Sequence, residues 1–217
     1  MIALQGLYVV TPELADDERL SALVSAALAG GARAVQYRAK HLPPAQRQRQ
    51  AAQLAALCRR AAALFIVNDD ADLAAAVGAD GVHIGREDAA IARARARLPH
   101  GLIGVSCYNR LDLAQAAQAA GADYVAFGRF FPSRTKPDAV QADPALLREA
   151  RAVLRVPPGK PQGVPLVAIG GITAENGRRL VEAGADMLAV IDGVFGRPDV
   201  EAAARALAAL FPAPPPP

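Results

Sequence analysis

The sequence predicts one domain of the α/β class, in which eight strand–helix units close into a single (β/α)8 TIM barrel. Three observations support this fold class. Short apolar runs alternate with helical stretches, and the alternation repeats eight times along the chain. The runs are continuously apolar, as expected for parallel strands buried on both faces. A Gly-Ala-Asp or Gly-Ala-Arg triplet precedes four of the runs, and glycine there can end a helix in the left-handed conformation.

The apolar runs give the predicted strands, which are Gly6–Val10, Ala34–Arg38, Leu64–Asn68, Gly81–Ile84, Ile103–Cys107, Tyr124–Gly128, Leu166–Gly170 and Met187–Ile191. A helical stretch of about 8–18 residues is expected after each of them. A doubly wound sheet is the alternative, but its first turn is normally rich in glycine, and residues 10–13 contain none. We expect the barrel to occupy residues 1–211 and the proline-rich residues 212–217 to form a disordered tail.

Composition limits the classes of function. The chain has 217 residues, a net charge of +3 and 5% aromatic residues, which argues against a nucleic-acid-binding surface. No apolar run approaches the roughly 18 residues of a membrane span, and the first residues do not resemble a signal peptide, so a cytoplasmic protein is expected. Two cysteines make no disulfide framework. We expect Cys58 to be a buried structural thiol, and Cys107, at a strand end, leaves a catalytic thiol as an open alternative.

Cationic side chains follow the second predicted strand. Strand alternation places Gln36, Arg38 and Lys40 on the same side. Two cations and an amide at the open end of a barrel favour an anionic ligand, because unpaired charge is costly to bury and because guanidinium and ammonium groups both bind phosphate. A structural ion-pair cluster with Asp69 or Asp88 is the alternative interpretation.

Carboxylates follow the next two predicted strands. Asn68, Asp69 and Asp70 end the third strand, and Asp88 lies just after the fourth. We expect Asp70 to cap the following helix, which leaves Asp69 free to face the open end. Asp69 and Asp88 could then hold Mg²⁺ together with substrate phosphate oxygens, since Mg²⁺ prefers oxygen ligands. Helix capping is the alternative role for Asp88.

Later segments supply further candidates at the same end. Residues 129–137 form a long polar segment, and Ser133, Thr135 and Lys136 within it could bind phosphate or exclude water. Gly171 follows the seventh strand, where many barrels bind phosphate through backbone amides. His83 lies inside the fourth strand, and a hydrogen-bonded core histidine is the favoured interpretation over a catalytic base.

Several motifs in this order resemble the thiamine-phosphate synthase family, also called thiamine-phosphate pyrophosphorylase. The resemblance covers nearly the whole chain. It rests on residues 36–40 (Gln-Tyr-Arg-Ala-Lys), 67–69, 81–88, 104–106, 127–137 and 168–172. It implies a transferase of thiamine biosynthesis that moves an alkyl group. An aminopyrimidine diphosphate loses pyrophosphate, in a dissociative course, and the nitrogen of a thiazole phosphate, plain or carboxylated, takes the methylene carbon to give thiamine phosphate.

The resemblance also implies roles for individual residues. Gln36, Arg38, Lys40 and Asn68 would bind the pyrimidine diphosphate, Ser106 would contact the pyrimidine, and Asp69 and Asp88 would hold Mg²⁺. The thiazole phosphate would be bound by Ser133, Thr135, Gly171 and the backbone of Ile191 and Asp192. Lys136 would reach the pyrophosphate, so that Arg38, Lys40, Lys136 and Ser106 form the implied catalytic set. The implied partners are small-molecule substrates, with neither nucleic acid nor membrane.

Two departures keep alternatives open. Asp192 stands where the family usually has a small hydroxyl residue, and we expect its side chain to turn away from phosphate. A catalytically silent ligand-binding barrel is the hypothesis that this residue supports. A thiazole tautomerase on the same barrel would carry histidine where this chain has Arg129, and its relatives lack the full diphosphate-binding set. Ala39 and Ser133 are milder departures.

Overall fold

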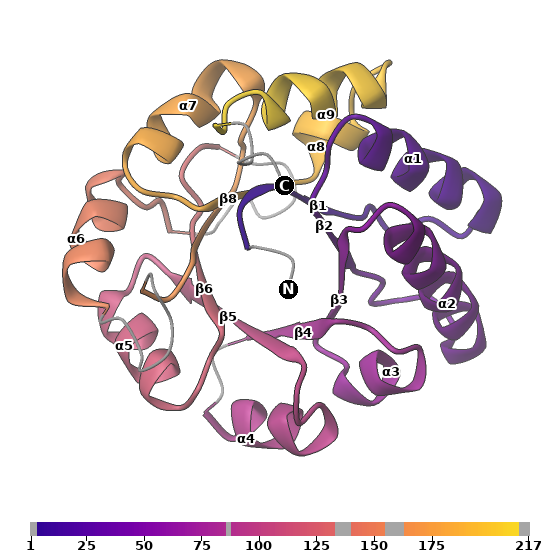
Figure 1. Ribbon diagram of the computed structural model, residues 1–217, viewed down its shortest axis with the longest axis horizontal. Helices are drawn as coiled ribbons and strands as arrows, with labels where there is room; N and C mark the ends of the chain where they lie inside the picture. Colours follow the sequence, from indigo (N-terminus) through magenta and orange to yellow (C-terminus); the bar gives the residue numbers. More distant parts are fainter. Residues whose placement is uncertain (1–3, 86–87, 133–139, 155–162, 213–217) are drawn as a thin grey trace.

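The computed structural model describes residues 4–85, 88–132, 140–154 and 163–212. Eight parallel strands, β1 to β8, form a closed barrel in which each strand pairs with the next and β8 pairs with β1. Helices surround the barrel on its outside (Figure 1). The strands are β1 Gly6–Val10, β2 Ala34–Tyr37, β3 Leu64–Asn68, β4 Gly81–Ile84, β5 Leu102–Tyr108, β6 Tyr124–Phe127, β7 Leu166–Ile169 and β8 Met187–Val190.

The predicted TIM barrel is therefore confirmed, with small differences at strand ends. The helices are α1 Asp17–Ala29, α2 Pro44–Arg60, α3 Ala71–Ala76, α4 Asp88–Arg97, α5 Leu111–Ala119, α6 Ala145–Val153, α7 Ala174–Glu182, α8 Asp192–Phe195 and α9 Val200–Ala208. The expectation of a helix of about 8–18 residues after every strand was wrong for β3 and β8. Only the six-residue α3 follows β3, only the four-residue α8 follows β8 directly, and α9 completes the ring of helices.

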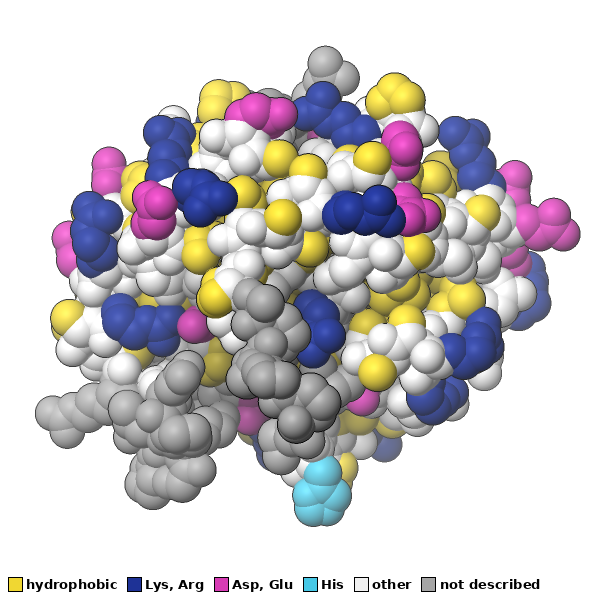
Figure 2. Space-filling view, turned by 45° about the horizontal axis from the view of Figure 1, so that its top comes forward, with side chains coloured by type: hydrophobic (Ala, Val, Ile, Leu, Met, Phe, Trp, Pro, Cys, Tyr) yellow, Lys and Arg dark blue, Asp and Glu magenta, His cyan; other side chains and the backbone are white. Residues whose placement is uncertain are grey.

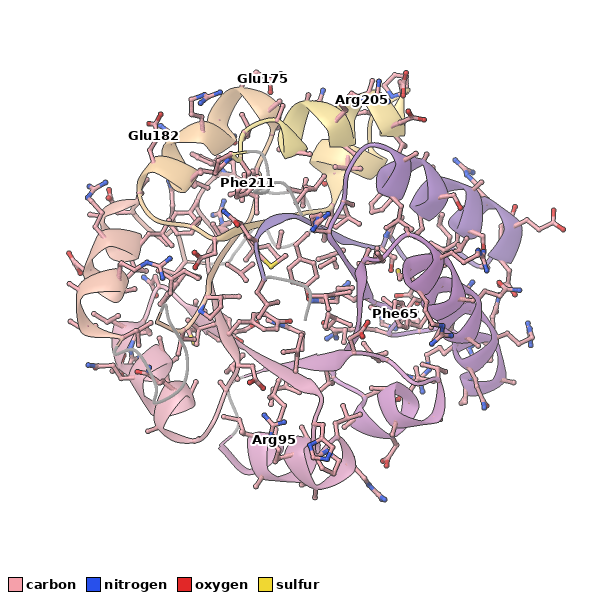
Figure 3. The ribbon with its side chains drawn as sticks, viewed as in Figure 1. Phe65, Arg95, Glu175, Glu182, Arg205 and Phe211 are labelled. Carbon is pink, nitrogen blue, oxygen red and sulfur yellow. The ribbon has the colours of Figure 1, made fainter. Side chains whose placement is uncertain are left out.

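The strands bury both faces, as their continuous apolar sequences predict. One face packs on the helices, and Phe65 of β3 lies on the side of α2 (Figure 3). The other face fills the barrel interior with a second apolar cluster that contains Tyr8, Tyr124 and Met187. Among the described residues, no helix is both long and apolar enough to cross a bilayer.

The Gly-Ala-Asp triplets join neighbouring strands. Their glycines, and the glycine of the Gly-Ala-Arg triplet, all have positive φ, with 98° at Gly31, 63° at Gly78, 92° at Gly121 and 111° at Gly184. Each aspartate donates its backbone N–H to a carbonyl near the start of the preceding strand, and its carboxylate accepts the N–H of that same strand residue. The bonds to carboxylate oxygen measure 2.8 Å for Phe65 to Asp80, 3.0 Å for Ile103 to Asp123 and 2.7 Å for Leu166 to Asp186.

Candidate active site at the carboxyl ends of the strands

The segment after β2 is held by residues that follow β1. The hydroxyl of Thr11 accepts the backbone N–H of Arg38 at 3.0 Å, and the carboxylate of Glu13 accepts those of Lys40 at 3.0 Å and His41 at 2.7 Å. Burial raises the pKa of Glu13, but these two hydrogen bonds outweigh it, and the net pKa lies below the ordinary value of 4.5. Glu13 therefore stays ionised and fixes the backbone that carries Arg38 and Lys40.

Lys40, Asn68 and Asp69 form one polar cluster. The Lys40 ammonium lies 3.4 Å from the Asp69 carboxylate, which also accepts a hydrogen bond of 2.7 Å from the Asn68 amide. The side chains of Lys40 and Asp69 are 47% and 49% exposed, so their ion pair contributes little to stability and can exchange for other charged partners. The ion pair considered as the alternative role for these cations thus occurs, but at a solvent-accessible edge.

Asp70 caps the following helix, as predicted, and Asp69 does not. Asp70 is the N-cap of α3, and its carboxylate accepts the N–H of Leu73 at 2.9 Å. Asp69 has φ 61°, in the left-handed region that few residues other than Gly, Asn and Asp adopt readily, and its N–H donates to the carbonyl of His83. Asp88 is the first residue of α4, and its side chain lies outside the described part of the structure, as do Arg86 and Glu87.

The described donor set suits a cation that shares its ligands with substrate. Within the described residues no group of three or more His, Cys, Asp or Glu side chains could hold a metal ion. Asp69, with an exposed carboxylate beside an amide, offers oxygen donors at an open site. Such a site fits Mg²⁺, which commonly takes one or two carboxylates and completes its shell with water and phosphate oxygens.

A chain of hydrogen bonds crosses the barrel interior beneath this edge. The Gln36 amide donates to the Tyr8 hydroxyl at 2.8 Å, and the hydroxyls of Tyr8 and Tyr124 lie 3.0 Å apart. The imidazole of His83 contacts the Tyr124 hydroxyl through Nδ1 at 3.1 Å and the Ser106 hydroxyl through Nε2 at 2.9 Å. The interpretation of His83 as a hydrogen-bonded core histidine is confirmed, and two predicted substrate-binding residues lie at the ends of one network.

Sequence reasoning missed Tyr8 and Tyr124. Both are fully buried, and burial raises the pKa of Tyr8 to about 12 and that of Tyr124 well above its ordinary value of 10.0, so both hydroxyls stay neutral. The available signal was a hydroxyl-bearing residue at an inward-facing position of an otherwise apolar strand. A glycine on β5 is the second signal, since a Cβ at Gly104 would lie 1.9 Å from Cζ of Tyr124.

The glycines after β6 and β7 let two segments touch. A Cβ at Gly128 would lie 2.1 Å from the Ile169 carbonyl oxygen, and one at Gly171 would lie 2.2 Å from that of Pro132. Across this seam Phe131 donates its N–H to the Gly170 carbonyl at 3.0 Å. Gly171 thus has a packing role beside its predicted phosphate contact. Ser133, Thr135 and Lys136 lie outside the described residues.

At the end of β8, Ile191 precedes α8 and its carbonyl accepts the N–H groups of Val194 and Phe195. Asp192 begins this short helix and is exposed. The two cysteines are poor nucleophiles, because burial raises the pKa of both Cys58 and Cys107 to about 12. The alternative of a catalytic Cys107 is therefore disfavoured by its surroundings.

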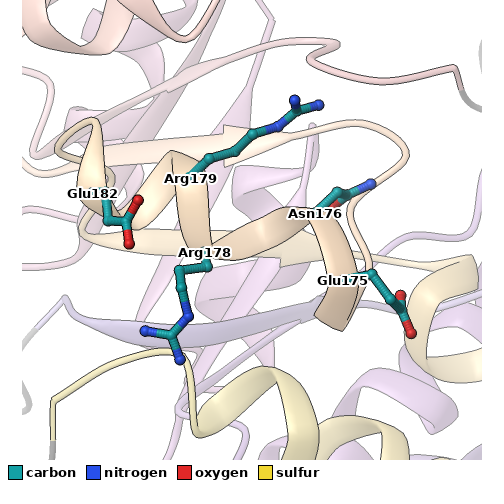
Figure 4. A pocket seen from close by; sticks show the side chains of 5 residues that line it. All are labelled: Glu175, Asn176, Arg178, Arg179 and Glu182. Carbon is teal, nitrogen blue, oxygen red and sulfur yellow. The ribbon is translucent and has the colours of Figure 1, made fainter.

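The outer surface adds less specific features. On the upper part of the face in Figure 2, lysine and arginine side chains are interspersed with acidic ones. A depression of about 350 Å³ lies on α7 and is lined by Glu175, Asn176, Arg178, Arg179 and Glu182, all from that one helix (Figure 4). The Arg179 guanidinium also lies 4.3 Å from the centre of the Phe131 ring, which ties α7 to the segment after β6.

Known proteins match the chain over nearly all of its length. The family model described as thiamine monophosphate synthase matches residues 7–194. A thiamine-phosphate synthase of Chromobacterium violaceum is 58% identical over 95% of this chain and 96% of its own length. A thiamine-phosphate synthase of Thiobacillus denitrificans is 57% identical over 97% of this chain and 96% of its own length.

A solved structure agrees with these sequence matches. The thiamine phosphate pyrophosphorylase from Pyrococcus furiosus superposes with a TM-score of 0.82 at 37% identity and covers 95% of both chains. The expected family resemblance is therefore confirmed at the level of sequence and of fold. This chain belongs to the thiamine monophosphate synthase family.

Proposed function

We propose that this protein is a thiamine-phosphate synthase, a transferase that joins the methylene carbon of an aminopyrimidine diphosphate to the nitrogen of a thiazole phosphate and releases pyrophosphate. The observation that carries the proposal is the gathering of Gln36, Lys40, Asn68 and Asp69 at one end of the barrel, within a chain of this family. A cation, two amides and a carboxylate at one edge suit a diphosphate ester with an attached ring.

Binding of the diphosphate falls to the segment after β2. Arg38 offers a planar pair of donors and Lys40 a compact charge, and Thr11 and Glu13 hold their backbone. Charge builds on the diphosphate oxygens as the carbon–oxygen bond breaks, so cations fixed beforehand stabilise the transition state more than the ground state. Lys136 is proposed to act on the same leaving group.

Asp69 and Asp88 are proposed to hold Mg²⁺, and the ion would neutralise pyrophosphate charge when bound. Lys40 then has a second task, because its present partner Asp69 would face the ion and leave the ammonium free for a phosphate oxygen. Asn68 keeps the Asp69 carboxylate oriented through its amide.

The remaining residues position the two rings. Gln36 and Ser106 are proposed to contact the pyrimidine, and Ser133, Thr135, Gly171 and the backbone of Ile191 and Asp192 the thiazole phosphate. A side-chain nucleophile is not needed when the pyrimidine cation forms before attack. This course agrees with the suppressed ionisation of Cys58 and Cys107. A cytoplasmic location stays a prediction of the sequence.

The decisive experiment measures thiamine phosphate formation from the pyrimidine diphosphate and the thiazole phosphate, with Mg²⁺ and with a chelator. Product that disappears with the chelator and returns with added Mg²⁺ supports both the reaction and the ion. Absence of product in Mg²⁺ would contradict the proposal, and the same sample, tested for thiazole isomerisation and for ligand binding by calorimetry, would then separate the tautomerase from the silent barrel.

A further inference from the structure

The hydrogen-bond chain inside the barrel has a direction. The Tyr8 hydroxyl accepts a hydrogen from the Gln36 amide, so its own hydrogen must go to its other neighbour, the Tyr124 oxygen. A buried hydroxyl that donated to nothing would carry an uncompensated desolvation penalty. Both hydroxyls are neutral and fully buried, so neither can obtain a partner from solvent.

The same argument determines which ring nitrogen of His83 carries hydrogen. The Tyr124 oxygen accepts from Tyr8, so its single hydrogen is donated to Nδ1 of His83. A neutral imidazole whose Nδ1 accepts carries its hydrogen on Nε2, and that nitrogen lies 2.9 Å from the Ser106 hydroxyl. Ser106 therefore accepts from His83, and its own hydrogen can be donated to a ligand.

The barrel interior holds this hydrogen-bond network at the expense of apolar packing. The ring of Tyr124 lies over Gly104, where any Cβ would fall within 2.4 Å of the tyrosine hydroxyl oxygen. The same ring stacks on His83 with centroids 5.6 Å apart and meets the Tyr8 ring edge-on at 6.2 Å. Four strands, β1, β4, β5 and β6, thus give up apolar packing in the barrel interior to hold three polar groups in line.

We propose that Tyr8, Tyr124 and His83 are positioning residues that make Ser106 a hydrogen-bond donor and leave the Gln36 carbonyl oxygen as an acceptor, for recognition of the aminopyrimidine ring. The inference rests on the proposed function of the site. An aminopyrimidine presents ring nitrogens that accept and an amino group that donates, and this pair of protein groups is complementary to both. A ring that lacks one of these features would leave a protein donor or acceptor unpaired.

The first test is the Tyr124→Phe variant, which keeps the ring and removes only the hydroxyl. Without it, Nδ1 of His83 loses its donor and the hydrogen on Ser106 loses its fixed direction. We expect KM for the pyrimidine diphosphate to rise about tenfold, as for one lost hydrogen bond. The dissociation constant of inorganic pyrophosphate with Mg²⁺, measured by calorimetry, should change less than twofold, because Arg38 and Lys40 are untouched.

Tyr37→Phe is the matched control. Its hydroxyl is also buried and donates to Gln50 at 2.9 Å, but on the helix side of the sheet. The control should lose similar stability and leave both ligands' affinities unchanged. The proposal is overturned if Tyr124→Phe weakens the binding of the pyrimidine diphosphate and of pyrophosphate equally, or if it weakens the binding of neither.

The second test is made on the wild-type protein, and a variant serves only to assign the signals. Nitrogen-15 NMR of histidine-labelled wild-type protein reports which ring nitrogen of each of the three histidines carries hydrogen. We expect the His83 signal, which is assigned by its disappearance in His83→Asn, to show a hydrogen on Nε2 and none on Nδ1. A hydrogen on Nδ1 would overturn the proposal. This result is independent of turnover. An inactive protein with the expected His83 tautomer would therefore contradict the proposed function and leave the proposed direction of the hydrogen bonds intact.

Discussion

The carboxylate of Glu13, in the segment after β1, holds the backbone N–H of Lys40, in the segment after β2, at a distance of 3.0 Å. A second oxygen of the same carboxylate holds the N–H of His41. An acidic side chain beside a proposed diphosphate site would be unfavourable by charge alone. Its use as a backbone clamp explains its position, since it orders the segment that carries the cations.

Replacing Glu13 should therefore weaken substrate binding without unfolding the protein. We expect Glu13→Ala to raise KM for the pyrimidine diphosphate about three- to tenfold, because an exposed charged hydrogen-bond pair contributes modestly. Steady-state kinetics with thermal unfolding as control would measure this. Glu13→Gln keeps one acceptor oxygen, so its KM should lie between those of wild type and Glu13→Ala. An unchanged KM in Glu13→Ala would show that Glu13 does not support substrate binding.

The clamp also predicts a dependence on acid. The pKa of Glu13 is lowered in the folded protein, so its ionised form contributes stability above the ordinary value of 4.5, and this contribution is lost as pH falls through the lower, folded-state pKa. We expect the stability difference between wild type and Glu13→Ala to be constant from about pH 7 to 5 and to shrink below about pH 4.5. Urea unfolding of both proteins across this pH range would measure the difference in their free energies of unfolding. A difference that stays constant below about pH 4.5 would show that the carboxylate charge is unimportant.

Asp69 should be required for turnover and not for folding. Its side chain is 49% exposed, so its loss removes a proposed Mg²⁺ ligand and little packing. Asp69→Asn is the suitable variant, because asparagine tolerates the left-handed backbone at φ 61° that alanine resists. We expect turnover to fall at least about 100-fold and the Mg²⁺ concentration for half activity to rise. Near-normal activity would exclude Asp69 as a metal ligand.

The carboxylates that join neighbouring strands should affect stability alone. Asp186 accepts the N–H of Leu166 at 2.7 Å and pairs with the Arg151 guanidinium at 2.6 Å. Asp186→Ala leaves a strand N–H unpaired, which should cost ~2 kcal/mol and lower Tm by about 4–8 °C with kcat/KM unchanged. Arg151→Ala, which leaves the strand bond intact, should cost less. Equal losses in the two variants would assign the stability to the ion pair instead.

Thiol reagents should leave the folded enzyme active. Burial raises the pKa of the Cys58 and Cys107 thiols to about 12, and only the thiolate reacts readily. At pH 8 we expect no labelling of the native protein within an hour and labelling of both thiols after unfolding in guanidinium, as mass spectrometry would report. Rapid modification of Cys107 with loss of activity would reopen its catalytic role.

Local patterns in the sequence predicted the barrel and part of the site. Continuous apolar runs predicted all eight strands, and the helix expected after Asp70 distinguished this capping carboxylate from that of Asp69, which does not cap the helix. Contacts between distant residues were out of reach. Tyr8 and Tyr124 are 116 residues apart, and no local spacing indicates that their hydroxyls meet inside the barrel. Likewise, the close approach of Gly171 to the carbonyl of Pro132 could not be predicted from the local sequence.

The four glycine triplets have a regular placement around the barrel. They precede β2, β4, β6 and β8. In each, the third residue (Arg33, Asp80, Asp123 or Asp186) donates its N–H to the carbonyl of the first or second residue of the strand before. The structural period of this barrel is therefore a pair of strands. A chain that arose by repeated duplication of one two-stranded unit would keep this fourfold mark. On that reasoning, the natural places to divide or recombine the molecule fall between β2 and β3, β4 and β5, and β6 and β7, and cuts inside a pair would break the hydrogen bonds that define it.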